Sequence, residues 1–401
     1  MTARPRLVSI TTHPMTTRLL LRGQLAFMRE HGFDVTAIAS PGPELDDVAR
    51  DEGVATIGVP MSRELTPVAD LVSLARLYAQ LHRIRPHIVH AGTPKAALLG
   101  MLAAWALGVP VRIYNLKGLR LETLTGVRYQ VLALVERITS GCATWVLCEG
   151  PGLRDEYVAR GFASATKAGV IGPGLPNGLD ASRFEKGVYS EAQVAEQRRS
   201  LGIPAGAPII GFVGRFVRDK GMIELCDAFE AILQRLPQVW LLLVGDFERG
   251  DPVPPEYVAK LQQHPQIVRT GYVANAAPFY PLMDVLAFPS YREGFPNVPM
   301  EAAAAEVPTV GYRATGIPDA VLDGVTGTIV ERGDAKALEA ALFRYLTDPD
   351  LRQRHGAAGR RRATTEFRRE AMWERTLAEY GRQLAERGVP GPDLEAGSGG
   401  A

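Results

Sequence analysis

The sequence of 401 residues has few cysteines, almost no net charge and none of the common nucleotide-triphosphate or hydrolase signatures. Its three cysteines, Cys142, Cys148 and Cys226, lack metal-ligand spacing, so we expect buried thiols in a reducing compartment rather than zinc or disulfides. The formal net charge of +1 gives no global field for nucleic acid. Neither a P-loop nor a Ser-His-Asp signature is present.

Export and membrane-spanning signals are also missing from the sequence. The N-terminal stretch MTARPRLVSITTHP has no apolar core of a signal peptide, which predicts a cytoplasmic protein. The longest apolar stretch, residues 96–111, contains two glycines and a proline. It is shorter than the roughly 18 residues that indicate a membrane span. We therefore expect a buried core helix that runs into a strand.

Short β-rich runs alternate with longer helical segments in the first half of the chain. One helix is expected across residues 20–32, ending at Gly32. The expected strands are residues 7–12, 34–40, 87–92, 111–116 and 144–149. Strands separated by helices predict a parallel sheet with helices on both faces.

A segment rich in glycine and proline, residues 169–184, separates this series from a second one. The second series has expected strands at residues 209–215, 239–245, 267–273, 285–290 and 309–312. The fold class is therefore α/β, with two Rossmann-like doubly wound domains that face a cleft, where ligands sit beyond the carboxyl ends of the strands.

The expected domains are residues 1–180, joined by a returning helix at about 371–387, and residues 181–370. The final helical segment carries one apolar stripe, which consists of Phe367, Met372, Trp373, Leu377, Tyr380 and Leu384. Residues 388–401 are rich in proline, glycine and serine, which predicts a disordered tail.

Two cations follow the strand that ends in FVG. Arg215 and Lys220 lie on the loop before the next helix, where they are well placed to clamp a diphosphate. Arginine binds phosphate oxygens with two parallel hydrogen bonds, while lysine acts as a point charge. Taken alone, two loop cations are more often ordinary surface residues.

Two glutamates flank a turn in the stretch REGFPNVPMEAAAAE. Pro299 fits the first position of a helix, which places Asn297 or Val298 at the cap and Glu301 at about the third position. The free N–H groups of a helix start favour an anion, and a carboxylate beside it can accept hydrogen bonds from a sugar diol. The alternative for Glu301 is a glutamate that caps the helix, and the alternative for Glu293 is a solvated loop residue.

These motifs resemble those of the family 4 retaining glycosyltransferases with the GT-B fold. REGFPNVPMEAAAAEVPTV is similar to the two-glutamate motif of that family, GRFVRDKG to its donor-phosphate loop and NGLD to its domain-entry motif. HAGTPKAALLG and IYNLKGLRLET resemble the bacterial branch that builds capsule, exopolysaccharide or lipid-linked glycans. The resemblance extends from the first strand to the final aromatic helix.

The resemblance implies roles for individual residues. Arg215 and Lys220 would hold the diphosphate of a nucleotide sugar, Glu293 the donor-sugar hydroxyls and Glu301 the ribose. The remaining implied donor-site residues are Phe295, Asn297 and Val298 at the sugar phosphate and Tyr272 and Val273 near the base. The segment from Phe367 to Tyr380 would cross back to the N-terminal, acceptor-binding domain. No metal or other cofactor is expected, because fixed cations and a helix start can hold the leaving charge.

One position departs from the family pattern. Lys117 in NLKGL stands where many relatives have a histidine that contacts the donor sugar. We group Lys117 with the catalytic residues, although a contact with an acceptor phosphate is the alternative.

Further candidates for acceptor binding follow the early strands. Lys95 and Thr93 follow the strand at 87–92, and a surface lysine at a helix start is an equally good interpretation of Lys95. His13 and Thr16 lie in the first loop, in place of a glycine-rich one. His90 is expected to be a packing residue.

The favoured function is transfer of a hexose or N-acetylhexosamine to a lipid-linked or polysaccharide acceptor in cell-envelope glycan synthesis. Lysine and arginine outnumber aspartate and glutamate by 20 to 15 through Arg183, which favours peripheral contact with the inner face of the membrane. Ordinary surface variation explains that excess equally well. A nucleotide-sugar epimerase of the same fold, a binding protein without turnover and a transferase acting on a small aglycone are the alternatives.

Overall fold

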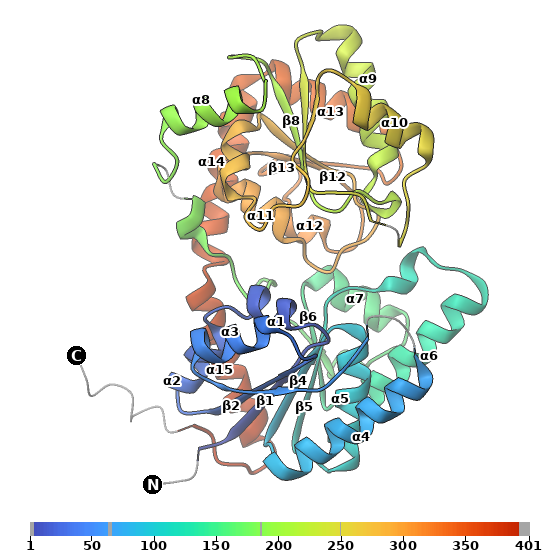
Figure 1. Ribbon diagram of the computed structural model, residues 1–401, viewed down its shortest axis with the longest axis vertical. Coiled ribbons are helices and arrows are strands. Elements are labelled where there is room, and N and C mark those ends of the chain that lie inside the picture. Colours follow the sequence, from blue (N-terminus) through green and yellow to red (C-terminus); the bar gives the residue numbers. More distant parts are fainter. Residues whose placement is uncertain (1–3, 63–65, 185–186, 249, 393–401) are drawn as a thin grey trace. The chain divides into compact units, whose positions relative to one another are not determined.

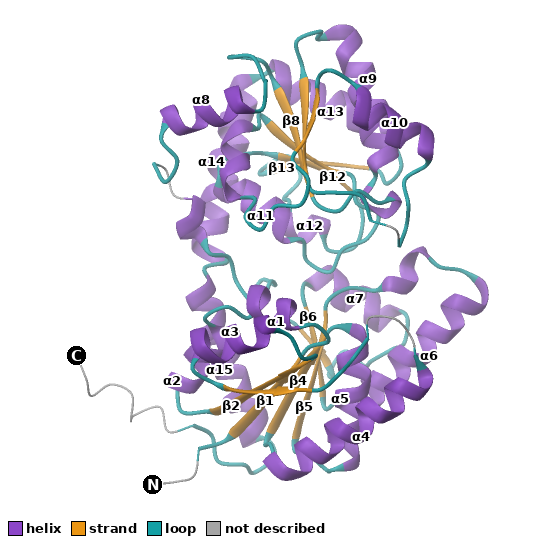
Figure 2. Ribbon diagram, in the orientation of Figure 1, coloured by secondary structure: helices purple, strands orange, loops and turns teal. Residues whose placement is uncertain are grey.

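The computed structural model describes residues 4–62, 66–184, 187–248 and 250–392. The chain forms two compact units: unit 1 comprises residues 1–178 and 370–401, and unit 2 comprises residues 179–369. Each unit is a parallel sheet covered by helices (Figure 1, Figure 2), which confirms the predicted pair of Rossmann-like folds. The predicted disordered tail lies outside the described residues from position 393 onward.

Unit 1 contains a seven-stranded sheet in the order β3-β2-β1-β4-β5-β6-β7, with every neighbouring pair parallel. The strands are β1 (Arg6–Ile10), β2 (Asp34–Ala39), β3 (Ala55–Gly58), β4 (Ile88–Gly92), β5 (Val111–Leu116), β6 (Trp145–Cys148) and β7 (Ala168–Gly169). The sequence predicted the five inner strands. It missed β3 and β7, which are short and lie at the two edges.

The helices of unit 1 are α1 (Pro14–Leu20), α2 (Gln24–Glu30), α3 (Pro43–Glu52), α4 (Pro67–Ile84), α5 (Pro94–Ala106), α6 (Gly126–Cys142), α7 (Pro151–Ala159) and α15 (Arg369–Ala385). The single helix predicted at 20–32 is wrong, because Gly23 separates α1 from α2. Gly23 has a φ of 80°, and a Cβ there would lie 2.6 Å from the Trp373 ring. Only glycine fits this turn without strain.

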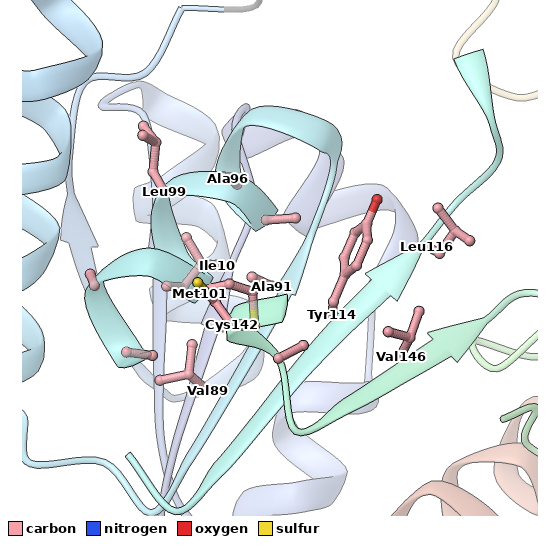
Figure 3. Close-up of a cluster of buried hydrophobic side chains, with 14 of the residues drawn as sticks. Ile10, Val89, Ala91, Ala96, Leu99, Met101, Tyr114, Leu116, Cys142 and Val146 are labelled. Atoms are coloured by element: carbon pink, nitrogen blue, oxygen red, sulfur yellow. The ribbon is translucent and has the colours of Figure 1, made fainter. Parts of the chain in front are cut away.

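The core of unit 1 lies on both faces of its sheet. Figure 3 shows one of the two clusters, where α5 packs its apolar side chains on β1, β4 and β5. The labelled residues are Ile10, Val89, Ala91, Ala96, Leu99, Met101, Tyr114, Leu116, Cys142 and Val146. The stretch 96–111 is thus a core helix that leads into β5, as predicted. Cys142, Cys148 and Cys226 are buried free thiols.

Unit 2 contains a six-stranded parallel sheet in the order β10-β9-β8-β11-β12-β13. Its strands are β8 (Ile209–Val213), β9 (Trp240–Val244), β10 (Ile267–Arg269), β11 (Val285–Phe288), β12 (Thr309–Tyr312) and β13 (Gly327–Val330). Its helices are α8 (Glu191–Ser200), α9 (Met222–Arg235), α10 (Pro255–Gln263), α11 (Asn297–Ala304), α12 (Ile317–Ala320), α13 (Ala335–Thr347) and α14 (Pro349–Glu366).

The two segments that connect the units lie side by side. The Leu179 N–H donates to the Phe367 carbonyl at 2.7 Å, and the Arg369 N–H donates to the Leu179 carbonyl at 3.2 Å. Beyond this point α15 returns to unit 1, where Met372, Tyr380 and neighbouring apolar residues join the core. The predicted returning helix is therefore present. Phe367 is the exception, because it packs inside unit 2.

Candidate active site

The carboxyl edge of the unit 2 sheet holds the Lys220–Glu293 pair. The 3-10 turn η3 (Arg218–Lys220) follows β8, and Glu293 lies on the loop after the neighbouring strand β11. The Lys220 Nζ donates to Glu293 Oε1 at 2.5 Å, and the two side chains are 17% and 15% exposed. The predicted phosphate cation and the predicted sugar carboxylate are thus in direct contact.

Gly221 allows these two loops to approach closely. Its φ is 72°, and a Cβ there would lie 2.2 Å from the Pro289 carbonyl oxygen. A larger residue would push η3 away from the end of β11. The glycine after Lys220 therefore sets the spacing between the cation and Glu293.

Arg215 has a different partner from Lys220. Its guanidinium contacts Glu248 at 2.7 Å, and both side chains are well exposed. An exposed pair of this kind is weak, so a diphosphate can displace Glu248 at little cost. The predicted phosphate role of Arg215 therefore stays a prediction that this exposed pair does not oppose.

Helix α11 begins earlier than the sequence interpretation placed it. Asn297 is the first helical residue and Pro296 the cap, so Pro299 is the third residue and Glu301 the fifth. The prediction of Pro299 at the first position was wrong, because Pro296 and not Asn297 or Val298 supplies the extended cap. The Asn297 and Val298 N–H groups still form the start of the helix, whereas Pro299 has none.

Glu301 is half-buried and has a tyrosine partner. The Tyr280 hydroxyl donates a hydrogen bond to Glu301 Oε2 at 2.6 Å. Burial raises the pKa of the Glu301 carboxyl, while the Tyr280 hydrogen bond and the Arg183 charge act in the opposite direction. Glu301 is therefore held by a tyrosine and is not the capping residue that the alternative interpretation proposed.

The other predicted donor-site residues differ in exposure. The Phe295 ring packs on Phe367 with centroids 5.3 Å apart, whereas Asn297 is exposed. The prediction that Tyr272 and Val273 end a strand was wrong, because β10 ends at Arg269 and both residues lie on the loop beyond it. The Tyr272 ring is 75% exposed, which leaves its face open for stacking.

The carboxyl edge of unit 1 carries a second lysine–glutamate pair. Lys117 Nζ donates to Glu149 Oε1 at 2.6 Å, and the Glu149 side chain is only 7% exposed. The sequence interpretation missed Glu149. The signal was available, since Lys117 and Glu149 each directly follow one of two neighbouring parallel strands.

The predicted acceptor residues of unit 1 already have protein partners. Lys95 is buried and forms an ion pair with Asp70 of α4 at 2.7 Å, which favours a structural role for it. The Thr93 hydroxyl contacts the Thr12 hydroxyl at 2.7 Å, with Thr93 at a φ of 69°. His13 caps α1 by accepting from the Met15 N–H at 3.2 Å.

Two further residues complete the predicted set in unit 1. Thr16 lies half-buried on α1. His90 packs on Tyr380 of α15 and hydrogen-bonds to its hydroxyl. Burial, with the nearby Lys117 charge, lowers the pKa of His90 to about 3. His90 is therefore neutral near pH 7 and fits the packing role expected of it.

The described parts of the chain contain neither a metal-ligand cluster nor a membrane-spanning helix. Within them, no group of three or more histidine, cysteine, aspartate or glutamate side chains is placed to hold a metal ion. No described helix combines the length and apolar character needed to cross a bilayer.

The two sheets and their charged edges define a class of protein. Two Rossmann-like units, each with charged residues at the carboxyl edge of its sheet, are the architecture of GT-B proteins. HepE from Anabaena, solved with UDP and glucose, has the same fold. Its TM-score is 0.77 at 18% identity, over 94% of this chain and 100% of HepE.

Sequence comparisons identify the family. A glycosyl transferase 4-like domain matches residues 20–174, and the glycosyl transferases group 1 model matches residues 193–362. The capsular polysaccharide biosynthesis glycosyltransferase CapM of Staphylococcus aureus is 37% identical over 92% of this chain and 94% of CapM. The alpha-maltose-1-phosphate synthase of Mycolicibacterium smegmatis is 32% identical over 73% of this chain and 78% of that relative. The chain belongs to the family 4 glycosyltransferases.

Proposed function

We propose that this protein is a retaining glycosyltransferase of cell-envelope glycan synthesis. It moves a hexose or an N-acetylhexosamine from a nucleotide-diphosphate sugar to a lipid-linked or polysaccharide acceptor. The similarity to CapM over almost the whole chain supports the polysaccharide context. The observation that supports the donor chemistry is the contact between Lys220, the proposed phosphate cation, and Glu293, the proposed sugar-binding carboxylate.

The proposed reaction needs no protein nucleophile. The bond between sugar C1 and the diphosphate oxygen breaks, and a bond between C1 and the acceptor oxygen forms on the same face. The departing phosphate oxygen takes the acceptor proton. Lys220, Arg215 and the N–H groups at the start of α11 bind the growing negative charge, which lowers the barrier without a metal.

The remaining donor contacts follow from the same site. Glu293, released from Lys220 by the incoming diphosphate, accepts hydrogen bonds from donor-sugar hydroxyls. Glu301 binds the ribose diol, and the Tyr272 ring lies near the base. In unit 1, Lys117 contacts the donor sugar or an acceptor phosphate, and Thr93 and Thr16 line the acceptor side.

Donor consumption tests this proposal. Purified protein is incubated with UDP-, GDP- and dTDP-sugars one at a time, with and without metal and a membrane-lipid extract. UDP-sugars come first, because UDP and glucose are bound in HepE, a protein of the same fold. Mass spectrometry should show nucleotide diphosphate release that rises with lipid. Isomerised donor without diphosphate would instead indicate an epimerase, and a bound but unchanged donor a binding protein.

We also propose a cytoplasmic protein that touches the inner face of the membrane through α6. Four apolar side chains form one exposed stripe on α6: Val127, Val131, Leu134 and Ile138, with exposures of 79%, 46%, 57% and 39%. Exposed Arg128 and Arg137 flank the stripe. The sole acidic residue of α6, Glu136, is bonded to Tyr114 and Tyr157. An apolar stripe between arginines suits an anionic bilayer.

Vesicle flotation measures this contact. Leu134→Glu should reduce binding to vesicles that contain anionic lipid, and Arg137→Gln should reduce the preference for anionic over neutral lipid. Val325→Glu is the matched control, because Val325 is an apolar residue of unit 2 with 51% exposure. If Leu134→Glu and Arg137→Gln bind the vesicles as the Val325→Glu control does, α6 has no role in membrane contact.

A second candidate acceptor is a small phosphorylated sugar. The similarity to alpha-maltose-1-phosphate synthase over 73% of this chain favours it. Glucose 1-phosphate supplied as acceptor, in the absence of lipid, distinguishes the two candidates by the mass of the product.

A further inference from the structure

The residues that precede Lys220 and Glu293 in the sequence form a second ion pair. Arg292 Nη2 contacts Asp219 Oδ2 at 2.5 Å, and the two side chains are 25% and 13% exposed. The dipeptide Asp219–Lys220 on the first loop thus faces the dipeptide Arg292–Glu293 on the second. Each loop thus contributes one positive and one negative side chain, and each side chain faces the opposite charge on the other loop.

Backbone contacts tie the same two loops together around this double bridge. The Tyr291 N–H donates to the Asp219 carbonyl at 2.8 Å, and the Asp219 N–H donates to Asp251 Oδ2 at 2.7 Å. The Ser290 hydroxyl bonds to the Asp219 and Arg292 carbonyls, at 3.4 and 3.2 Å. The backbone of Asp219 is therefore fixed from both sides.

The two ion pairs have different fates when a donor binds. The diphosphate competes with Glu293 for the Lys220 ammonium, and the sugar hydroxyls compete with Lys220 for the Glu293 carboxylate. We call Asp219–Arg292 the inner pair and Lys220–Glu293 the outer pair. The inner pair lies one residue earlier on each loop, and its two side chains keep each other as partners. We infer that Asp219 and Arg292 are positioning residues that keep the two loops in register while the outer pair separates, an inference that rests on the proposed function.

The inner pair also isolates Glu293 from a competing cation. Arg292 Nε and Asp219 Oδ1 are buried and lack a hydrogen-bond partner among the described residues. If Asp219 loses its charge, the Arg292 guanidinium is left partly buried without a counter-charge. The adjacent Glu293 is the carboxylate on the same loop, and Arg292 would then compete with the donor sugar for it.

Steady-state kinetics of Asp219→Asn, Arg292→Gln and the double variant test the inference. Each single variant should lower kcat about 100-fold, because a misplacement of about 1 Å at a reacting group can cost that much, with a much smaller change in donor KM. The double variant should be no worse than either single one, because both remove the same pair. Asp219→Glu should restore part of the turnover.

A fold defect is separated from a positioning defect by counting active sites. UDP titration gives the fraction of each variant that binds nucleotide, and kcat is expressed per binding site. Glu230→Gln is the matched control, because Glu230 forms an exposed ion pair with Lys260 at 2.8 Å in the same unit. It should keep wild-type kcat.

The outcomes distinguish this inference from the proposed function. Wild-type kcat in Asp219→Asn and Arg292→Gln, together with loss of turnover in Lys220→Ala, would overturn the positioning role and leave the function intact. A lower binding-site fraction with unchanged kcat per site would assign the pair to stability alone. A wild-type protein that consumes no donor would overturn the proposed function itself.

Discussion

Unit 1 and unit 2 each place a lysine beside a glutamate at the carboxyl edge of a parallel sheet. In unit 1 the two residues follow their strands immediately, and the register that pairs Leu116 with Cys148 brings Lys117 to Glu149. In unit 2, Lys220 lies seven residues beyond β8 and Glu293 five beyond β11. Strand register therefore fixes the first pair, whereas loop contacts hold the second, so the second can open without disturbing its sheet.

A second comparison concerns carboxyl groups held by tyrosines. In unit 1, Tyr114 and Tyr157 donate to Glu136 at 3.0 and 3.2 Å, and in unit 2, Tyr280 donates to Glu301 at 2.6 Å. Burial raises both carboxyl pKa values, that of Glu136 to about 7. Glu301 lies in α11 near a helix start that can hold an anion, while Glu136 lies on α6 and is bonded to two tyrosines of the unit 1 core. The same tyrosine–carboxyl chemistry thus occurs at the proposed donor site of unit 2 and in the core of unit 1.

The largest expected effect is on the unit 2 pair. Lys220→Ala and Glu293→Ala should each lower kcat by about 100- to 1,000-fold, because each removes a group that binds the donor as charge develops. Melting temperatures should change little, since the pair joins loops. Turnover near the wild-type value in both variants would refute the assignment of this site.

Arg215→Ala should have a smaller effect than Lys220→Ala. The Arg215–Glu248 pair is exposed, so its loss costs little stability, but one phosphate ligand disappears. We expect kcat/KM for the donor to fall about tenfold or more, in line with a charged hydrogen bond. An effect as large as that of Lys220→Ala would show that both cations act as one unit.

Lys117→Met tests the unit 1 pair. It leaves the nearly buried Glu149 without a cation, so both the melting temperature and the acceptor KM are expected to change. Donor KM should be unaffected if Lys117 contacts the acceptor, and raised if it contacts the donor sugar. Lys117→Met combined with Glu149→Leu should recover the melting temperature but not the activity.

The smallest expected effect concerns pH and stability. Since the folded-state pKa of Glu136 is about 7, above its ordinary value of 4.5, the folded protein binds more protons between these values. Stability should therefore fall as pH rises from about 4.5 to 7, by at most roughly 3 kcal/mol. Glu136→Gln should flatten this slope in melting curves recorded between pH 5 and 8. A slope equal to that of the wild type would exclude Glu136 as its source.

Much of the fold was readable in the sequence. Apolar runs such as VSI and LLLV gave the inner strands, because strands buried on both faces carry no polar alternation. Edge strands β3, β7 and β13 escaped, since they are short and only partly buried, so they lack the apolar runs of the inner strands. The break at Gly23 also escaped, because its reason is the Trp373 ring, which lies 350 residues further along the chain.

The sequence by itself determined the family, the parallel sheets and the residue types of the donor site. Local motifs suffice there, because each carries its own chemistry. Only the tertiary structure decided which charges are partners: Lys220 with Glu293, Lys117 with Glu149, and Lys95 with Asp70. The physical reason is that an ion pair needs its two groups within a few ångströms of each other. Strand order and loop contacts bring these groups together, and no single segment of the sequence determines either of them.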